Sequence, residues 1–264
     1  MAVESPSTIP MTDEQLYAQA ASAYCASLPL EHFMESTGQS TQRKITLESF
    51  DLICAVRPDV HIFSELLVQY GPVTAILRVV PDNMVLIHDG EVEAHGSYDI
   101  ALQVARPFFV IDYISFLISR KDNVDNMRRY ERDLHVPYYM TFEPESLILK
   151  LFHLEAGIHG EQYFCVKPNT AGRFEIPELE LEFAILDDWV RFWFRGELQL
   201  RPAEMMRKLQ TIEAEIRAHD ERRHRIEAEQ RADDEQRRCE SVEVELAQFK
   251  AENERLRKHS ANGK

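Results

Sequence analysis

The chain has 264 residues and a formal net charge of −15 at pH 7, from 30 Lys and Arg against 45 Asp and Glu. From Arg201 onward the charges balance, 15 basic against 15 acidic, so residues 1–200 carry the whole excess. Lysine and arginine supply most non-specific affinity for nucleic acid, because they neutralise phosphates. An acidic body therefore argues against broad electrostatic binding to DNA or RNA, although a local basic patch remains compatible with it.

Four cysteines, at positions 25, 54, 165 and 239, contain no CxxC pair. This spacing indicates neither a disulfide framework nor a zinc knuckle, and it fits a reducing compartment best. No stretch reaches the ~18 apolar residues of a membrane span, and the N-terminal segment lacks the pattern of a signal peptide. We therefore expect a soluble, cytoplasmic protein with no membrane partner.

Composition divides the chain into four parts. Residues 1–28 contain early prolines and then an Ala-rich segment that Thr12 can cap, which predicts an N-terminal helical extension. Residues 29–200 alternate helix-like and strand-like patterns and predict one domain. Residues 202–258 are dense in Glu, Arg and Ala and predict a long helix, followed by a disordered tail at 259–264.

The elements expected in the central domain are two helices and several strands. Residues 41–56 have the apolar spacing of a helix, and residues 120–134 are typical of a second, polar helix. Segments rich in β-branched and aromatic residues predict strands at 60–70, 79–88, 107–118, 136–144, 146–154, 161–168, 179–186 and 189–200. This order predicts a mixed α/β fold, with a mixed sheet flanked by helices and enough residues for one sizeable core.

The C-terminal segment begins with Pro202, a good first-turn residue, and contains no glycine until Gly263. At 1.5 Å rise per residue its helix is about 80 Å long. Positions 242, 246, 249, 253 and 256 form a heptad seam, and the residue at 253 is an asparagine, which favours paired helices in register. We therefore predict a homo-oligomer formed through a coiled coil; the alternative is a single solvated helix.

Two acids interrupt apolar strand patterns. Asp82 follows Pro81, and Asp112 lies inside PFFVIDYIS thirty residues later. A carboxylate in an apolar strand must be paired, bind a metal or lie at an exposed strand end. Two such acids on neighbouring strands can share Mg²⁺, which activates water for attack on phosphorus. The alternative is that Asp82 caps a turn after Pro81 while Asp112 pairs with a neighbouring arginine.

The order and spacing of these blocks resemble the Uma family of predicted restriction endonucleases, a branch of the PD-(D/E)XK nuclease superfamily. The resembling blocks lie between His32 and Leu200 and include RPDVHIFSELLVQY, VVPDNMVLIHDG, PFFVIDYIS and RKDNVDNMRRYERDLHVPYY. The resemblance implies a restriction-endonuclease-like fold and an endonuclease that hydrolyses DNA phosphodiester bonds with Mg²⁺ or Mn²⁺. It matches Asp82 with the first metal-binding acid and Asp112 with the second, which in the family is usually Glu.

The chain departs from the family at the lysine positions. Ile114 occupies the third place of the (D/E)XK triplet, Phe116 stands where relatives often carry Lys, and the recurrent lysine of the next helix aligns with Asn126. Lys121, at the start of that helix, is the nearest surviving lysine and the candidate catalytic cation; a solvated surface role is the alternative. Glu65 is the candidate third metal-binding carboxylate, with an ordinary surface group as the alternative.

Two functions from different classes follow, with the endonuclease as the assignment and the scaffold as the alternative. The first is a divergent metal-dependent DNA endonuclease that uses Asp82, Asp112 and a migrated lysine. The second is a catalytically inactive nuclease-fold scaffold in which the coiled coil is the interaction or assembly module. For the first, the two carboxylates must lie on adjacent strands, about 4 to 6 Å apart.

Overall fold

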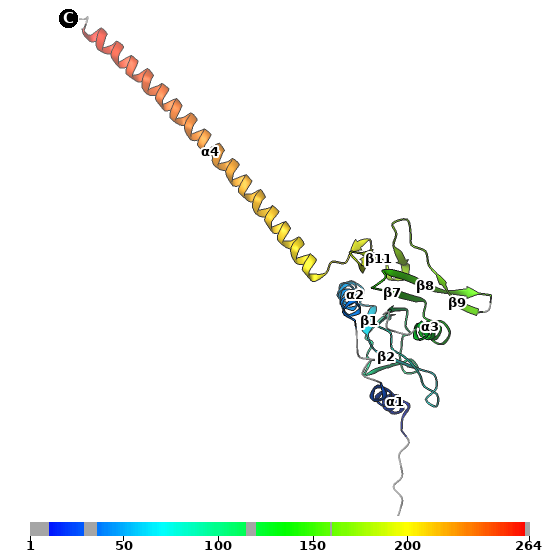
Figure 1. The fold of residues 1–264 in the computed structure, drawn as a ribbon. Helices are drawn as coiled ribbons and strands as arrows, with labels where there is room; N and C mark the ends of the chain where they lie inside the picture. The colour runs from blue at the N-terminus through cyan, green and yellow to red at the C-terminus, as the bar shows by residue number, and fades with distance from the viewer. Residues whose placement is uncertain (1–10, 29–35, 115–119, 159, 262–264) are drawn as a thin grey trace, which may run out of the picture. The chain divides into compact units, whose positions relative to one another are not determined.

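The computed structural model describes residues 11–28, 36–114, 120–158 and 160–261. It divides into two compact units, Met1–Arg201 and Pro202–Lys264. The first unit contains helices and three sheets, and the second is one helix, α4 (Pro202–Ala261) (Figure 1). The predicted class, mixed α/β followed by a long C-terminal helix, is confirmed.

The first unit is built around a six-stranded sheet with strand order β1-β4-β6-β7-β8-β9. Its strands are β1 (Val60–Ser64), β4 (Asn83–Ile87), β6 (Phe109–Tyr113), β7 (Tyr138–Glu143), β8 (Ile148–Gly157) and β9 (Gly160–Cys165). β6 and β7 are parallel, and the other neighbouring pairs are antiparallel. A parallel pair needs a crossover, and here the crossover contains α3 (Arg120–Arg128) and a π-helical turn at Arg129–Asp133.

Two smaller sheets complete this unit. One is antiparallel, in the order β10 (Phe174–Ile176), β11 (Leu181–Leu186), β12 (Trp189–Phe194) and β13 (Glu197–Leu198). The other has the order β3 (Leu77–Val79), β2 (Leu67–Tyr70) and β5 (Ser97–Asp99). α1 (Asp13–Ser27) packs on β2 and β5, and α2 (Thr37–Val56) packs on β12 and β1.

Both faces of the central sheet are buried at β4, β6 and β7. Neighbouring residues on a strand point to opposite faces, so Ile111 and Val110 of β6 belong to two different clusters. Ile111 packs in the cluster that contains Phe50 of α2, together with residues of β11 and β12. Val110 packs in the cluster that contains Tyr130 and Tyr139, on the face covered by the α3 crossover. Asp112 has the parity of Val110 and therefore points to the crossover face.

Three expected strands are shorter than their sequence patterns. The strand expected at 60–70 is two strands, because Glu65 takes a left-handed φ of 52° that interrupts extended backbone. In the segment expected as one strand at 79–88, β4 begins only at Asn83. It follows Pro81, which has no backbone N–H to donate. The strand expected at 179–186 begins at Leu181, because Pro177–Leu179 form a 3-10 turn.

The strand expected at 189–200 is also two strands, β12 and β13, because Arg195 and Gly196, with φ of 51° and 80°, form a turn between them. Strand β6 ends at Tyr113, and most of the remaining expected strand, residues 115–118, lies outside the described part of the chain. Helix α4 continues through Ala261, past the expected end at 258, because neither proline nor glycine follows Pro202 before Gly263. Among the described residues, no helix combines the length and apolar character needed to cross a bilayer.

Gln42 ties α2 to β12 and provides a test of this packing. Its side chain is fully buried, donates Nε2 to the Val190 carbonyl at 3.0 Å and accepts the Val190 N–H at 2.8 Å. Gln42→Leu leaves both backbone groups unpaired, so we expect a loss of about 2 to 5 kcal/mol in the free energy of unfolding, measured by urea denaturation. Lys44→Leu, on the exposed side of the same helix, should change it by less than about 0.5 kcal/mol; an equal effect of the two changes would contradict this packing.

Candidate functional site

The two predicted acids lie side by side at the end of neighbouring strands. The register pairs Asn83 of β4 with Ile111 of β6, which places Asp82 opposite Asp112. The Asp82 backbone N–H donates to Asp112 Oδ1 at 3.3 Å, and the Tyr113 N–H donates to Asp82 Oδ2 at 2.6 Å. The structure thus brings together the two acids singled out in the sequence; their roles stay predictions.

An arginine on α2 joins Asp82 to Glu65. Arg43 donates Nη2 to Asp82 Oδ1 at 2.8 Å, and its Nη1 lies 2.8 Å from Glu65 Oε1. The side chains of Arg43 and Asp82 are 12% and 24% exposed, whereas that of Glu65 is 61% exposed. The Arg43–Asp82 contact is thus shielded from water, and the Glu65 contact lies at the surface. The alternative interpretation of the sequence placed an arginine beside Asp112; in the structure Arg43 lies beside Asp82 instead.

The residues of α2 that face the acids are polar and follow helical spacing. Gln39 Nε2 donates to the Tyr113 carbonyl at 2.7 Å, and the Tyr113 hydroxyl lies 2.7 Å from Thr46 Oγ1 and 2.8 Å from Asn83 Oδ1. Gln39, Arg43 and Thr46 are separated by four and three residues, so they share one face of α2. A polar stripe on the buried side of a helix is the sequence signal that could have identified Arg43.

Asp112 is surrounded by tyrosines. It is 8% exposed, and the Tyr139 hydroxyl donates to its Oδ2 at 3.0 Å. Burial and the neighbouring charge of Asp82 raise the pKa of Asp112 to about 8. Burial also raises the pKa of Asp82, although the Tyr113 N–H and Arg43 oppose the shift. Asp112 is therefore largely protonated at neutral pH, while Asp82 holds the contact with Arg43.

Among the described residues, none of the candidate lysine positions places a cation beside the two acids. Lys121 is the second residue of α3, but its side chain lies outside the described part of the structure. Phe116 lies outside it altogether. Asn126, which aligns with the family's lysine, accepts a hydrogen bond from Arg129 Nη1 at 3.3 Å. The same Nη1 donates to the Arg78 carbonyl at 3.1 Å. The catalytic role of Lys121 stays a prediction.

The present side-chain arrangement does not fit a divalent metal ion. Asp82 gives one oxygen to Arg43 and the other to the Tyr113 N–H, and Asp112 accepts from the Asp82 N–H and the Tyr139 hydroxyl. Each carboxyl oxygen therefore already accepts a hydrogen bond, and a guanidinium supplies the positive charge. Within the described residues, no group of three or more His, Cys, Asp or Glu side chains is arranged to hold a metal ion.

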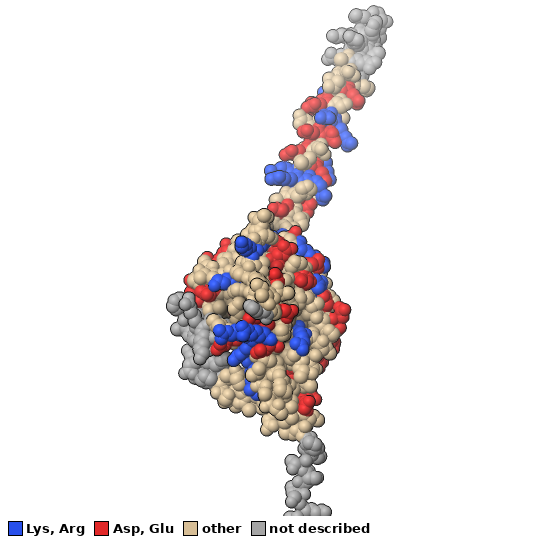
Figure 2. All heavy atoms as spheres, turned by 90° about the vertical axis from the view of Figure 1, so that its right-hand side faces the viewer, with Lys and Arg blue, Asp and Glu red and all other residues tan. Residues whose placement is uncertain are grey.

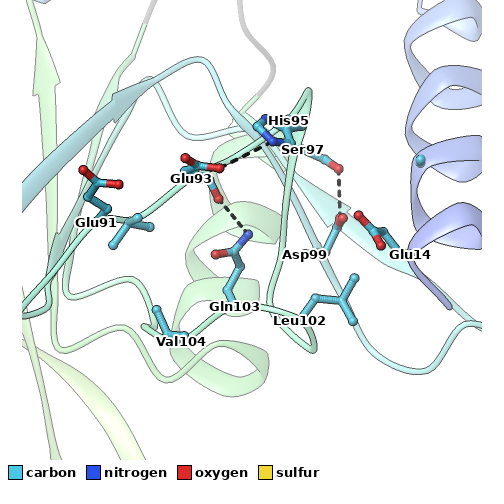
Figure 3. A pocket seen from close by; sticks show the side chains of 11 residues that line it. Glu14, Glu91, Glu93, His95, Ser97, Asp99, Leu102, Gln103 and Val104 are labelled. Carbon is cyan, nitrogen blue, oxygen red and sulfur yellow. Dashed lines mark hydrogen bonds and ion pairs between the residues drawn. The ribbon is translucent and has the colours of Figure 1, made fainter.

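A separate cleft of about 660 Å³ lies between α1 and the segment 91–104 (Figure 3). Its polar lining is mainly acidic, from Glu14, Glu91, Glu93 and Asp99. Internal contacts use several of these groups: Asp99 Oδ1 accepts from the Ser97 hydroxyl at 2.9 Å, and the Glu93 carbonyl accepts from Gln103 Nε2 at 3.1 Å. This acidic cleft is distinct from the Asp82–Asp112 pair and contains none of the predicted site residues.

Among the side chains that the structure describes near α3, the basic residues do not form an open positive surface. Figure 2 shows Lys and Arg side chains in small groups between acidic ones on the face drawn. Arg128 Nη1 lies 3.6 Å from Asp125 Oδ1, and Arg132 Nε lies 3.6 Å from Glu131 Oε2. Neighbouring acids partly balance these two charges, so residues 124–133 make a weak footprint for phosphates.

Comparison with known proteins does not assign a family. No family model and no curated protein matches the chain. Among solved structures, it is similar to a protein from Anabaena variabilis provisionally described as a nuclease belonging to DUF820, with 13% identity and a TM-score of 0.40. The match covers 55% of this chain and 75% of that chain. A likeness at this TM-score carries no argument, so the nuclease hypothesis depends on this chain's own residues.

The raised pKa of Asp112 predicts a pH dependence of stability. An acid that titrates near 4 in the unfolded chain and at about 8 in the folded one binds its proton more tightly in the folded state. Its contribution to stability is complete below pH 4 and is lost as pH rises to about 8, by up to about 1.4 kcal/mol per pH unit.

Asp112→Asn removes this titration. Urea denaturation between pH 4.5 and 8 should show the wild type losing stability relative to Asp112→Asn as pH rises. Asp51→Asn, a surface change on α2, controls for the removal of one acid and should follow the wild type. Parallel pH profiles for wild type and Asp112→Asn would show that Asp112 is ionised in the folded protein throughout.

Proposed function

We propose that this chain is a catalytically inactive scaffold with a nuclease-like acid pair, and that it acts as an assembly module through α4. The observation that carries this proposal is the Arg43 guanidinium, which lies 2.8 Å from both Asp82 and Glu65. At the acid pair, Arg43 supplies a positive charge. A nuclease of the predicted type takes this charge from a metal ion. Because this positive charge belongs to the chain itself, the acid pair needs no ion from solution.

The balance of charges supports an acid site that does not admit a divalent metal ion. Asp112 is largely protonated at neutral pH, so the principal negative charges are those of Asp82 and Glu65. Opening the site requires that Arg43 leave Asp82 and that Asp112 lose its proton. Separating a shielded ion pair costs about 3 to 5 kcal/mol, because one charge remains buried without its partner. A divalent ion would have to overcome this cost before it gained any binding energy.

Helix α4 supports the assembly role. Within this helix, all described side chains from Met205 to Ala251 are exposed, including the apolar ones. A monomeric protein seldom leaves a long series of apolar side chains in water. A partner that covers them would give this helix of 60 residues a function independent of the acid pair.

The second candidate function is a divergent DNA endonuclease that uses Mg²⁺ or Mn²⁺. The position of Asp82 opposite Asp112, with Glu65 joined to Asp82 through Arg43, favours it. In this candidate the three acids would be the metal-binding groups and Lys121 the catalytic lysine. Membership of the Uma family and DNA as the partner belong to this candidate and stay predictions.

One titration separates the two functions. We expect calorimetry to detect no binding of Mg²⁺ or Mn²⁺ to the wild type at the acid pair, and supercoiled DNA to remain intact under the same metals. Arg43→Gln frees the carboxylates of Asp82 and Glu65, so Mn²⁺ binding should become detectable, with an affinity about tenfold or more above the upper limit for the wild type, equivalent to about 1.4 kcal/mol.

Arg57→Gln is the matched control. Arg57 makes a similarly shielded, two-point contact with Asp59, at 2.6 and 2.8 Å, away from the acid pair. Its loss should leave Mn²⁺ affinity unchanged. DNA nicking by the wild type that disappears in Asp82→Ala would contradict the scaffold proposal and establish the endonuclease.

A further inference from the structure

The C-terminal half of α4 presents a regular apolar seam. Val242, Leu246 and Phe249 are 62%, 53% and 68% exposed and are separated by four and three residues. With Leu246 at heptad position a, the other two occupy position d. The preceding a position is Cys239, whose thiol is exposed, and the a position before that is Ala232. Small or apolar residues therefore occupy every a position from 232 to 246.

We propose that α4 pairs with α4 of a second copy of this chain as a parallel, in-register coiled coil over residues 228–256, with the two Cys239 side chains opposite each other. This inference deepens the assembly role proposed above and rests on it. The partner is identified by the charges that flank the seam.

Flanking charges at positions g and e match a parallel partner in register. In such a dimer, position g faces position e five residues later in the partner helix. Arg238 then faces Glu243 of the partner subunit, and Glu245 faces Lys250 of the partner subunit. Both contacts join opposite charges, and each occurs twice by symmetry. Charge pairs at these positions set partner choice and orientation in coiled coils.

The sequence after residue 251 continues the same pattern. By sequence, Asn253 continues position a and Leu256 position d, and positions g and e carry the opposite charges of Glu252 and Arg257. A buried asparagine at position a favours the register in which it meets its own copy. Glu235 is the charged exception at position d and limits how tightly the seam closes toward residue 228.

Geometry makes Cys239 a probe of this arrangement. Helix axes about 10 Å apart, each with Cα atoms at a radius of about 2.3 Å, leave about 5 to 6 Å between facing Cα atoms. A disulfide needs about 4.4 to 6.8 Å between Cα atoms. Two Cys239 residues facing each other therefore meet the requirement. In an antiparallel dimer each a position faces a d position, so identical cysteines do not meet.

The experiment uses the full chain with Cys25, Cys54 and Cys165 changed to Ser. Light scattering should give twice the chain mass of 30.7 kDa, and mild oxidation should convert most of the protein into a covalent dimer through Cys239. Val242→Cys combined with Cys239→Ser should crosslink as well, because d positions also meet in a parallel pair. Arg237→Cys combined with Cys239→Ser places the thiol at position f, and crosslinking should be at least about tenfold slower.

Each alternative result has a distinct meaning. A dimeric mass without crosslinks at 239 or 242 would overturn the parallel arrangement and leave the assembly role standing. Equal crosslinking at 237 and 239 would also overturn it, since random collision would explain both. A monomeric mass at all concentrations tested would overturn this inference and the proposed assembly role together.

A charge exchange tests the choice of partner. Glu245→Lys places lysine against Lys250 of the partner subunit, so the dissociation constant of the dimer should rise about tenfold. Adding Lys250→Glu restores opposite charges and should return the constant to the wild-type value. Failure of the second change to restore dimerisation would overturn the parallel register.

Discussion

The ion pair between Arg43 and Asp82 fixes the chemistry of the whole acid site. Two carboxyl groups at the end of a buried sheet repel each other and are poorly solvated. The structure resolves this conflict in two ways. Arg43 balances Asp82, while burial keeps the proton on Asp112 at neutral pH. The site therefore needs no ion from solution to remain stable, and this property separates the scaffold from the endonuclease.

The fold holds this arrangement from both faces of the sheet. On one side, polar residues of α2 bind the end of β6, as Gln39 does through the Tyr113 carbonyl. On the other, the α3 crossover places Tyr130 over the sheet, where its ring is tilted against that of Tyr139, with centroids 5.1 Å apart, and helps to bury Asp112. Because the parallel pairing of β6 and β7 requires that crossover, the topology itself sets the low exposure of the acid.

Local sequence patterns predicted the parts of the fold that depend on nearest neighbours. The apolar spacing of 41–56 identified α2, and the apolar run around Asp112 identified β6, whose alternate residues fill both buried faces. The interruption at Glu65 was missed, because a single left-handed residue leaves no trace in the apolar pattern. The start of β4 after Pro81 was visible only as a proline that cannot join the hydrogen-bond ladder.

The candidate site was predicted as a pair of acids but not as an ion pair. Asp82 and Asp112 were identified because carboxylates are unusual in apolar strands, and the strand register does bring them together. Arg43 is 39 residues away from Asp82 in sequence, on a helix predicted from its apolar residues alone. Its role depends on the tertiary packing of α2, which the spacing of polar residues suggests only in hindsight.

Diffraction from crystals soaked in Mn²⁺ would test the central claim most directly, because anomalous scattering locates the metal itself. We expect no anomalous peak between Asp82 and Asp112, and electron density for the Arg43 guanidinium in contact with Asp82 and Glu65. A peak coordinated by both aspartates, with Arg43 withdrawn, would contradict an acid site that excludes metal ions. It would instead support the metal-dependent endonuclease.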